Sequence, residues 1–226
     1  MGTVAYNLER VRERIARAAA EAGRNPGEVK LIAVSKGRSV GLIMEAARAG
    51  QTVFGENRAQ ELRDKLELVD RELEWHFIGH LQRNKVNMVV GKAVLIHSLD
   101  SERLAEAVDG RARDLGISQE VLLQVNVSRE ESKHGMEETE VSGLLDKTLT
   151  LPGLKVRGLM TIAPLLDDRE EARPYFRGLR ELRDGLAEKY PLADLGVLSM
   201  GMTQDFEVAV EEGANMVRIG TAIFAG

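Results

Sequence analysis

The chain contains 226 residues, which is enough for one α/β domain with a substantial hydrophobic core. It contains no cysteine, and this excludes disulfides, thiolate metal sites, iron–sulfur clusters and cysteine nucleophiles. The formal net charge of -5 argues against a protein that binds nucleic acid over its whole surface, because that function requires a basic face.

The N-terminal segment predicts an amphipathic helix. Apolar residues from Val4 to Ala18 recur every three or four positions among charged residues, and the pattern stops near Gly23. The charged N-terminus lacks the apolar core of a signal peptide. No stretch approaches the roughly 18 consecutive apolar residues that a membrane span requires. We therefore expect a cytoplasmic protein with no membrane partner.

Eight short apolar runs follow, and helical patterns separate them. The first run, 29–35, is rich in β-branched residues and nearly continuous in apolar character, as in a strand buried on both faces of a parallel sheet. The other predicted strands are 52–54, 74–78, 93–97, 121–127, 155–160, 195–199 and 216–219. The predicted helices between them are 41–50, 59–69, 82–90, 101–115, 137–149, 168–190 and 204–211.

This alternation of strands and helices predicts right-handed crossovers and an all-parallel sheet. We therefore predict a single domain over residues 1–226, an α/β fold of the (β/α)8 TIM-barrel type with an extra N-terminal helix. An open doubly wound sheet is the alternative, but no G-x-G-x-x-G motif follows the first strand.

Polar residues follow several predicted strands, at the end of a parallel barrel where active sites lie. Lys36 follows the first strand, where partial burial favours the neutral, nucleophilic amine and Schiff-base chemistry. The alternatives are a lysine that extends to water or one that pairs with Glu56. Asn57, which can both donate and accept hydrogen bonds, and His80 follow the second and third strands, and Met160 ends the sixth.

The last two strand ends suggest a phosphate site. Loops after strands seven and eight bind phosphate in many barrels through backbone N–H groups, and an arginine adds a permanent positive charge. An ordinary turn followed by a helix N-cap is the alternative interpretation. A phosphate site and an amine at one barrel end together suit pyridoxal 5′-phosphate, whose aldehyde reacts with lysine. The residues concerned are Ser199, Met200, Gly201, Arg218, Gly220 and Thr221.

Seven motifs in order along the chain carry a resemblance to a known family. They are 33–36 (AVSK), 54–57 (FGEN), 75–85 (WHFIGHLQRNK), 124–127 (QVNV) with 133–135 (KHG), 158–161 (GLMT), 198–202 (LSMGM) and 217–221 (VRIGT). With them the chain resembles the YggS/PROSC-type pyridoxal phosphate homeostasis family, whose barrel is similar to the N-terminal domain of bacterial alanine racemase.

The resemblance implies roles for individual residues. It implies that Lys36 holds the cofactor as an internal aldimine and that Arg218 faces the pyridine nitrogen. It also implies that Ser199, Gly220 and Thr221 contact the phosphate. Two positions depart from the family pattern: Gly37-Arg38 stands where Thr-Lys is more usual, and Arg58 where Tyr is usual. Both flank the expected pocket and could change which anion or partner it accepts.

The implied arginine restricts the chemistry. Arg218 can only donate hydrogen bonds, so a ring nitrogen opposite it stays unprotonated and is a poor electron sink. Racemisation also needs a second acid or base, which a tyrosine from an additional domain supplies in alanine racemases. This sequence ends soon after the eighth strand, and its three tyrosines fall in or beside helical patterns.

We therefore predict a non-catalytic carrier or buffer of pyridoxal 5′-phosphate in intracellular vitamin B6 homeostasis, monomeric, with apo-enzymes as candidate recipients. One alternative is weak amino-acid racemase-type activity, with Lys36 or His80 transferring protons. A more remote one is an unrelated sugar-phosphate enzyme with Lys36 as its Schiff-base residue.

Two further ligand classes are not expected. The four histidines, His76, His80, His97 and His134, fall on separate strands and loops without a metal-binding spacing. The basic residues of segment 83–92 have no interspersed aromatic residues, which favours a solvated helix face over a nucleic-acid site.

Overall fold

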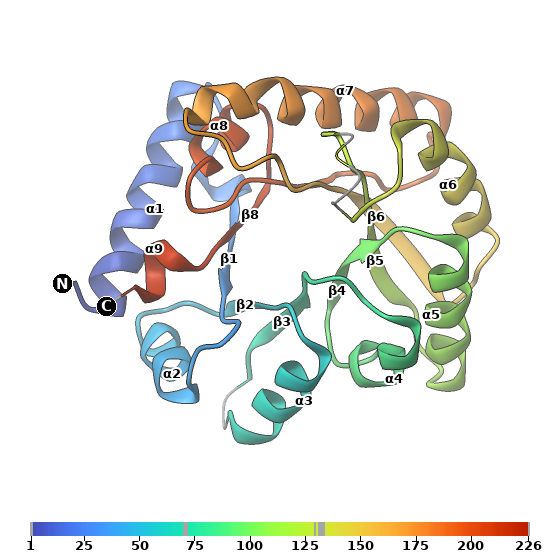
Figure 1. The fold of residues 1–226 in the computed structure, drawn as a ribbon, viewed down its shortest axis with the longest axis horizontal. Coiled ribbons are helices and arrows are strands. Elements are labelled where there is room, and N and C mark those ends of the chain that lie inside the picture. Colours follow the sequence, from blue (N-terminus) through green and yellow to red (C-terminus); the bar gives the residue numbers. More distant parts are fainter. Residues whose placement is uncertain (1, 70–71, 129, 131–133, 226) are drawn as a thin grey trace.

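The computed structural model describes residues 2–69, 72–128, 130 and 134–225. Eight parallel strands form a closed barrel in which each strand pairs with its neighbours in the sequence and β8 pairs with β1 (Figure 1). The predicted (β/α)8 fold is confirmed. The strands are β1 (Lys30–Val34), β2 (Val53–Glu56), β3 (Glu74–Phe77), β4 (Leu95–Leu99), β5 (Gln119–Gln124), β6 (Leu154–Met160), β7 (Val197–Ser199) and β8 (Met216–Ile219).

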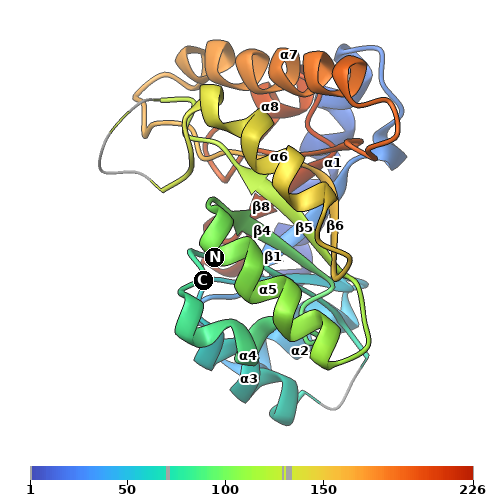
Figure 2. The same ribbon diagram turned by 90° about the vertical axis from the view of Figure 1, so that its right-hand side faces the viewer.

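The helices surround this barrel, as the perpendicular view also shows (Figure 2). They are α1 (Val4–Glu21), α2 (Val40–Arg48), α3 (Ala59–Leu68), α4 (Val86–Val89), α5 (Glu102–Asp114), α6 (Val141–Leu149), α7 (Arg173–Lys189), α8 (Phe206–Glu211) and α9 (Thr221–Phe224). The extra helix α1 begins after Thr3, whose hydroxyl accepts a hydrogen bond from the Tyr6 amide. It packs against α8 and α9.

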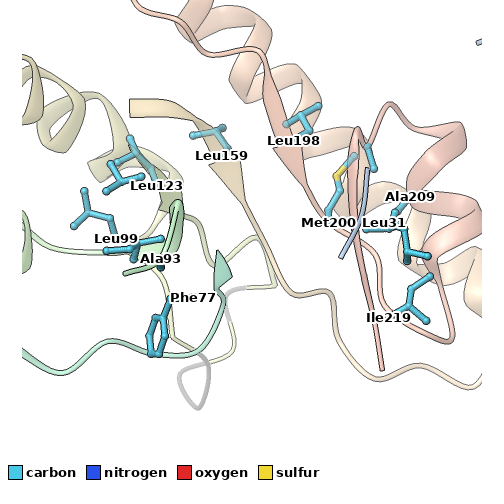
Figure 3. Close-up of a cluster of buried hydrophobic side chains, with 14 of the residues drawn as sticks. Leu31, Phe77, Ala93, Leu99, Leu123, Leu159, Leu198, Met200, Ala209 and Ile219 are labelled. Atoms are coloured by element: carbon cyan, nitrogen blue, oxygen red, sulfur yellow. The ribbon is translucent and has the colours of Figure 1, made fainter. Parts of the chain in front are cut away.

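Two layers of side chains fill the protein. Apolar side chains on the outer face of the strands meet the helices in one large cluster, which includes Leu31, Phe77 and Leu198 (Figure 3). A hydrogen bond joins His97 of β4 to Ser199 of β7. Since β4 and β7 are not neighbours, this bond crosses the barrel interior, and the inward face therefore carries polar side chains as well as apolar ones.

Some boundaries differ from those predicted. Strand β4 lies two residues later than expected because its buried part continues through His97 and Ser98, polar residues that do not read as strand core. The predicted helix 82–90 is a 3-10 turn, Arg83–Lys85, followed by the single turn α4. The predicted helix 168–190 likewise starts as a 3-10 turn, Arg169–Ala172, before α7. Helix α9 was not predicted, since four residues are too few to show a periodicity.

Gly201 lies just after β7, at a position where the backbone conformation and a close helix both favour glycine. Its φ is +91°, and a Cβ there would lie 2.6 Å from the Cβ of Ala209 in α8. We expect Gly201→Ala to lower the free energy of unfolding by about 1–3 kcal/mol, because both the backbone conformation and the helix contact would be strained. The control is Gly178→Ala in α7, where no atom lies within 4 Å of the added methyl. Urea denaturation of both variants measures the difference; equal stabilities would contradict the expectation.

Candidate functional site

A cavity of about 1070 Å³ opens at the carboxyl ends of β1, β6, β7 and β8. Its wall consists of residues that follow each of these strands, including the long segment 162–169 between β6 and α7. Gly220 brings the ends of β8 and β1 together, because a Cβ there would lie only 3.1 Å from the Val34 carbonyl oxygen. The cavity therefore lies over the place where the first and last strands close the barrel.

Lys36 lies on the β1 side of this cavity with its side chain exposed. Within the part of the chain that the structure describes, its ammonium group makes no hydrogen bond or ion pair. Glu56, the partner considered from the sequence, accepts instead from Ser35 Oγ and Lys65 Nζ, each at 2.6 Å. The Lys36 amine is thus left available to a molecule in the cavity.

A buried ionic cluster holds the turn that carries Lys36. Lys65 Nζ donates to the Ser35 carbonyl at 2.7 Å, to Glu56 at 2.6 Å and to Glu61 at 3.1 Å, which uses all three ammonium protons. Glu61 in turn accepts from the Gly37 amide at 2.8 Å. Although burial acts in the opposite direction, these hydrogen bonds from Gly37 and Lys65 hold the pKa of Glu61 below its usual value. The backbone on both sides of Lys36 is therefore anchored.

Arg218 enters the cavity from the β8 side. Its guanidinium is buried and donates to Ser199 Oγ at 2.6 Å and to the Thr161 carbonyl at 2.7 Å. Burial lowers the pKa of Arg218 to about 10, against the opposing effect of Asp205, so the group keeps its charge at neutral pH. Asp205 also lines the cavity, and burial raises its pKa although its Oδ1 accepts from the Met202 amide at 2.6 Å.

The site residues expected from the sequence separate into two groups. Four of them line the cavity: Lys36, Arg218, Gly220 and Thr221. Met160 is buried in the barrel interior against Leu95 and Leu122, and Met200 is buried with its amide on the Met216 carbonyl. Ser199 is buried as well, and its hydroxyl binds Arg218 and His97 instead of facing the cavity. Gly201 packs against α8.

Asn57 and His80 lie at the ends of β2 and β3 and are not among the residues that line this cavity. His80 stacks on His134, with ring centroids 4.1 Å apart and planes 10° apart, and lies 3.6 Å from Asp100. Asn57 is half-buried, and within the described chain its Oδ1 has no hydrogen-bond partner. Lys133, in the same motif as His134, falls outside the described residues.

The structure adds cavity residues that the sequence reasoning missed. Arg14 of α1 and Arg169 both line the cavity, and both bind the carboxylate of Glu207 on α8. Arg38 lines it beside Lys36, whereas Arg58, the other departure from the family pattern, is exposed and pairs with Glu61. No local sequence signal marks Arg14, because only the packing of α1 on α8 brings it to this end of the barrel.

Comparison with known proteins shows the family. Residues 6–226 match the family model of the alanine racemase N-terminal domain. The chain is 53% identical over 218 residues to the pyridoxal phosphate homeostasis protein of Aquifex aeolicus, with 96% of this chain and 95% of that protein covered. It is 42% identical over 229 residues to the protein of the same name from Escherichia coli, with 99% and 97% covered. The chain belongs to the pyridoxal phosphate homeostasis protein family.

Solved structures agree with this placement in the pyridoxal phosphate homeostasis family. PipY of Synechococcus elongatus, solved with PLP bound, has a TM-score of 0.83 and 39% identity, covering 95% of this chain and 99% of that one. An alanine racemase from Clostridium difficile has a TM-score of 0.76 at 14% identity, covering 98% of this chain and 59% of that one, and this likeness concerns the fold alone.

The described part of this family member offers neither a metal site nor a membrane-spanning helix. In the described ranges, no three His, Cys, Asp or Glu residues are grouped so that they could hold a metal ion. A helix with the length and hydropathy of a membrane span is likewise absent from the described residues.

Proposed function

We propose that this protein binds pyridoxal 5′-phosphate in the cavity over β1 and β8 and serves as a carrier or buffer of the cofactor in cytoplasmic vitamin B6 homeostasis. The observation that carries the proposal is that the amine of Lys36, which has no partner among the described residues, and the buried guanidinium of Arg218 line one cavity from the neighbouring strands β1 and β8. The bound PLP in the related PipY structure supports it.

The residues of the cavity fit this ligand. Five basic side chains line it against three acidic ones, which favours a molecule with a phosphate group. The volume of about 1070 Å³ exceeds what one small cofactor requires. The basic residues are Arg14, Lys36, Arg38, Arg169 and Arg218, and the acidic ones are Asp167, Asp168 and Asp205.

Each side of the cavity has a separate task in this proposal. When bound, pyridoxal phosphate supplies an aldehyde carbon that reacts with a primary amine. Lys36 provides that amine, and the anchored turn around it keeps the amine directed at the cavity. Arg218 offers only N–H donors, so it binds a ring nitrogen that accepts a hydrogen bond and keeps that nitrogen unprotonated. This arrangement favours storage of the cofactor over carbanion chemistry.

Thr221 and the Gly220 backbone are proposed to contact the phosphate, together with the segment 202–204 that lies across from them. Thr221→Ala is expected to weaken binding of pyridoxal 5′-phosphate about tenfold, the effect of one lost hydrogen bond to a charged group, and to leave binding of unphosphorylated pyridoxal unchanged. Isothermal calorimetry with both ligands measures this. Ser199→Ala should affect both ligands equally, because its hydroxyl does not face the cavity. If Thr221→Ala weakened the binding of both ligands equally, Thr221 would not be a contact of the phosphate.

The racemase-type alternative requires an acid or base across the cavity from Lys36. Among the described residues no tyrosine lines the cavity, and the lining carboxyl whose pKa burial raises, Asp205, is engaged by the Met202 amide, from which its Oδ1 accepts a hydrogen bond. We therefore favour the carrier function, with apo-enzymes that use pyridoxal phosphate as recipients.

The decisive experiment compares release with turnover. Protein loaded with pyridoxal phosphate should restore the activity of an apo-enzyme of this cofactor class, and the purified protein should not interconvert D- and L-amino acids. Sustained racemisation that depends on Lys36 would favour the racemase-type function over the carrier function. A protein that takes up no pyridoxal phosphate would overturn the proposal itself.

A further inference from the structure

A continuous chain of polar side chains crosses the barrel interior and ends at Arg218. It begins at the amino ends of the strands, where Lys30 of β1 donates to Glu74 of β3 at 2.9 Å. The remaining contacts are Glu74 Oε1 to His76 Nε2 at 2.7 Å, His76 Nδ1 to His97 Nε2 at 2.9 Å, His97 Nδ1 to Ser199 Oγ at 2.9 Å and Ser199 Oγ to Arg218 Nη1 at 2.6 Å. His76, His97, Ser199 and Arg218 are all at most 3% exposed.

Arg218 at one end of this chain can only donate hydrogen bonds, and the Glu74 carboxylate at the other end can only accept them. Together they fix the direction of every hydrogen bond in between. Arg218 can only donate, so Ser199 Oγ accepts from it and has one O–H to give. The other contact of that hydroxyl is His97 Nδ1, which must therefore be unprotonated and accept. His97 then carries its proton on Nε2 and donates to His76 Nδ1, and His76 carries its proton on Nε2 and donates to the Glu74 carboxylate.

The reverse order is unfavourable. If His97 donated from Nδ1, the buried Ser199 hydroxyl would accept two hydrogen bonds and its own proton would have no acceptor, which is unfavourable for a buried donor. A doubly protonated His97 would add a buried cation beside Arg218. Burial is the main cause that holds the pKa of His97 well below its usual value, and the positive charge of Arg218 acts in the same direction.

We propose that Glu74, His76, His97 and Ser199 form a directed hydrogen-bond relay, in which both histidines are neutral and carry their proton on Nε2, and that this relay positions the Arg218 guanidinium. With Nη1 held by Ser199 and Nη2 held by the Thr161 carbonyl, the plane of the guanidinium is fixed, and Arg218, which lines the cavity, keeps further N–H groups for a ligand there. These four are positioning residues, since they act through Arg218. The role of Arg218 toward a ring nitrogen rests on the proposed function, whereas the positions of the protons on His76 and His97 do not.

The tautomers can be observed directly. In protein labelled with ¹⁵N at its four histidines, long-range ¹⁵N–¹H correlation should show His76 and His97 protonated on Nε2 and bare at Nδ1, and the neutral form of His97 should persist between about pH 5 and 8. Substitution of His80 and His134 by glutamine assigns the two buried rings. A proton on Nδ1 of His97, or an imidazolium at that position, would overturn the relay whether or not the protein binds the cofactor.

Substitutions test the positioning. His97→Leu removes the acceptor of the Ser199 proton, so we expect pyridoxal to bind about tenfold more weakly and the spectrum of the bound cofactor to become dependent on pH, because Arg218 no longer holds one orientation. His97→Gln keeps one donor and one acceptor and should recover much of the affinity. Ser98→Ala is the matched control, since this neighbouring serine is also buried but its hydroxyl has no partner in the described chain.

The outcomes separate the relay from the proposed function. Loss of affinity in His97→Leu without a new pH dependence of the spectrum would indicate a merely structural role and overturn the positioning. If His97→Leu does not fold, the ¹⁵N tautomers of the unmodified protein decide the relay. Wild-type protein that binds neither pyridoxal nor its phosphate would overturn the proposed function and the ring-nitrogen role together.

Discussion

Replacing Lys36 with alanine is expected to abolish covalent capture of pyridoxal phosphate. The amine of Lys36 has no partner within the described residues and faces the cavity, so no other contact competes for it. Wild-type protein mixed with the cofactor and reduced with borohydride should gain the mass of one reduced cofactor, and its visible absorption band should disappear on reduction. Lys36→Ala should show neither change.

Lys155 provides the control for this experiment. It is an exposed lysine near the amino end of β6, at the opposite end of the barrel from the cavity. Lys155→Ala should therefore be modified like the wild type, with the label located on Lys36 by peptide mapping. A Lys36→Ala protein that still gains the full mass would mean that another lysine carries the cofactor.

Replacing Lys65 with methionine is expected to destabilise the fold by about 3–5 kcal/mol, the cost of leaving a buried charge without its partner. Glu56 is completely buried, and Lys65 is its ion-pair partner at 2.6 Å. The same substitution releases the Ser35 carbonyl and Glu61, which anchor the turn around Lys36. Cofactor affinity should fall together with stability, as urea denaturation and calorimetric titration would measure.

Two further variants test this explanation. The double variant Lys65→Met with Glu56→Gln no longer buries an unpaired carboxylate, so part of the lost free energy of unfolding should return. The turn around Lys36 should remain without its anchoring hydrogen bonds from Lys65, so cofactor affinity should stay low. Arg63→Met in the same helix removes only an exposed pair with Asp64 and should leave the denaturation midpoint nearly unchanged. If Lys65→Met is as stable as Arg63→Met, the cluster does not support the site.

The barrel and part of the site could be predicted because both depend on local pattern. Parallel strands place the residues at their carboxyl ends together, and Lys36, Arg218, Gly220 and Thr221 do line the cavity at that end, whereas their contact with a cofactor stays a prediction. The pattern says nothing about position around the ring of eight strands. It therefore could not tell that Asn57 and His80 lie away from the residues that line the cavity.

The directions of the side chains on the short strands were harder to predict. Strand β7 has only three residues, too few to show which face is inward, and Ser199 lies on the interior face instead of at the cavity. His76 and His97 are 21 residues apart on separate strands, and their rings come into contact because β3 and β4 pair with His76 opposite Leu95, a register that the sequence does not specify. Arg14 and Arg169 reach the cavity because both bind Glu207, which is distant in the sequence, and no sequence motif predicts such long-range contacts.

The cavity's place over the β8–β1 contact has a consequence for exchange of whatever it holds. Helix α9 follows β8 directly, and Asn7 of α1 donates to the carbonyls of Ile223 and Ala225 at 3.0 and 3.3 Å. The first and last helices, α1 and α9, are thereby joined to each other, and α9 lies next to β8 (Figure 1). A molecule that contacted both Lys36 and Arg218 would connect two strands, β1 and β8, that also pair with each other. Binding in the cavity is therefore expected to stabilise the β1–β8 contact, and any loss of that contact is expected to weaken binding by the same free energy.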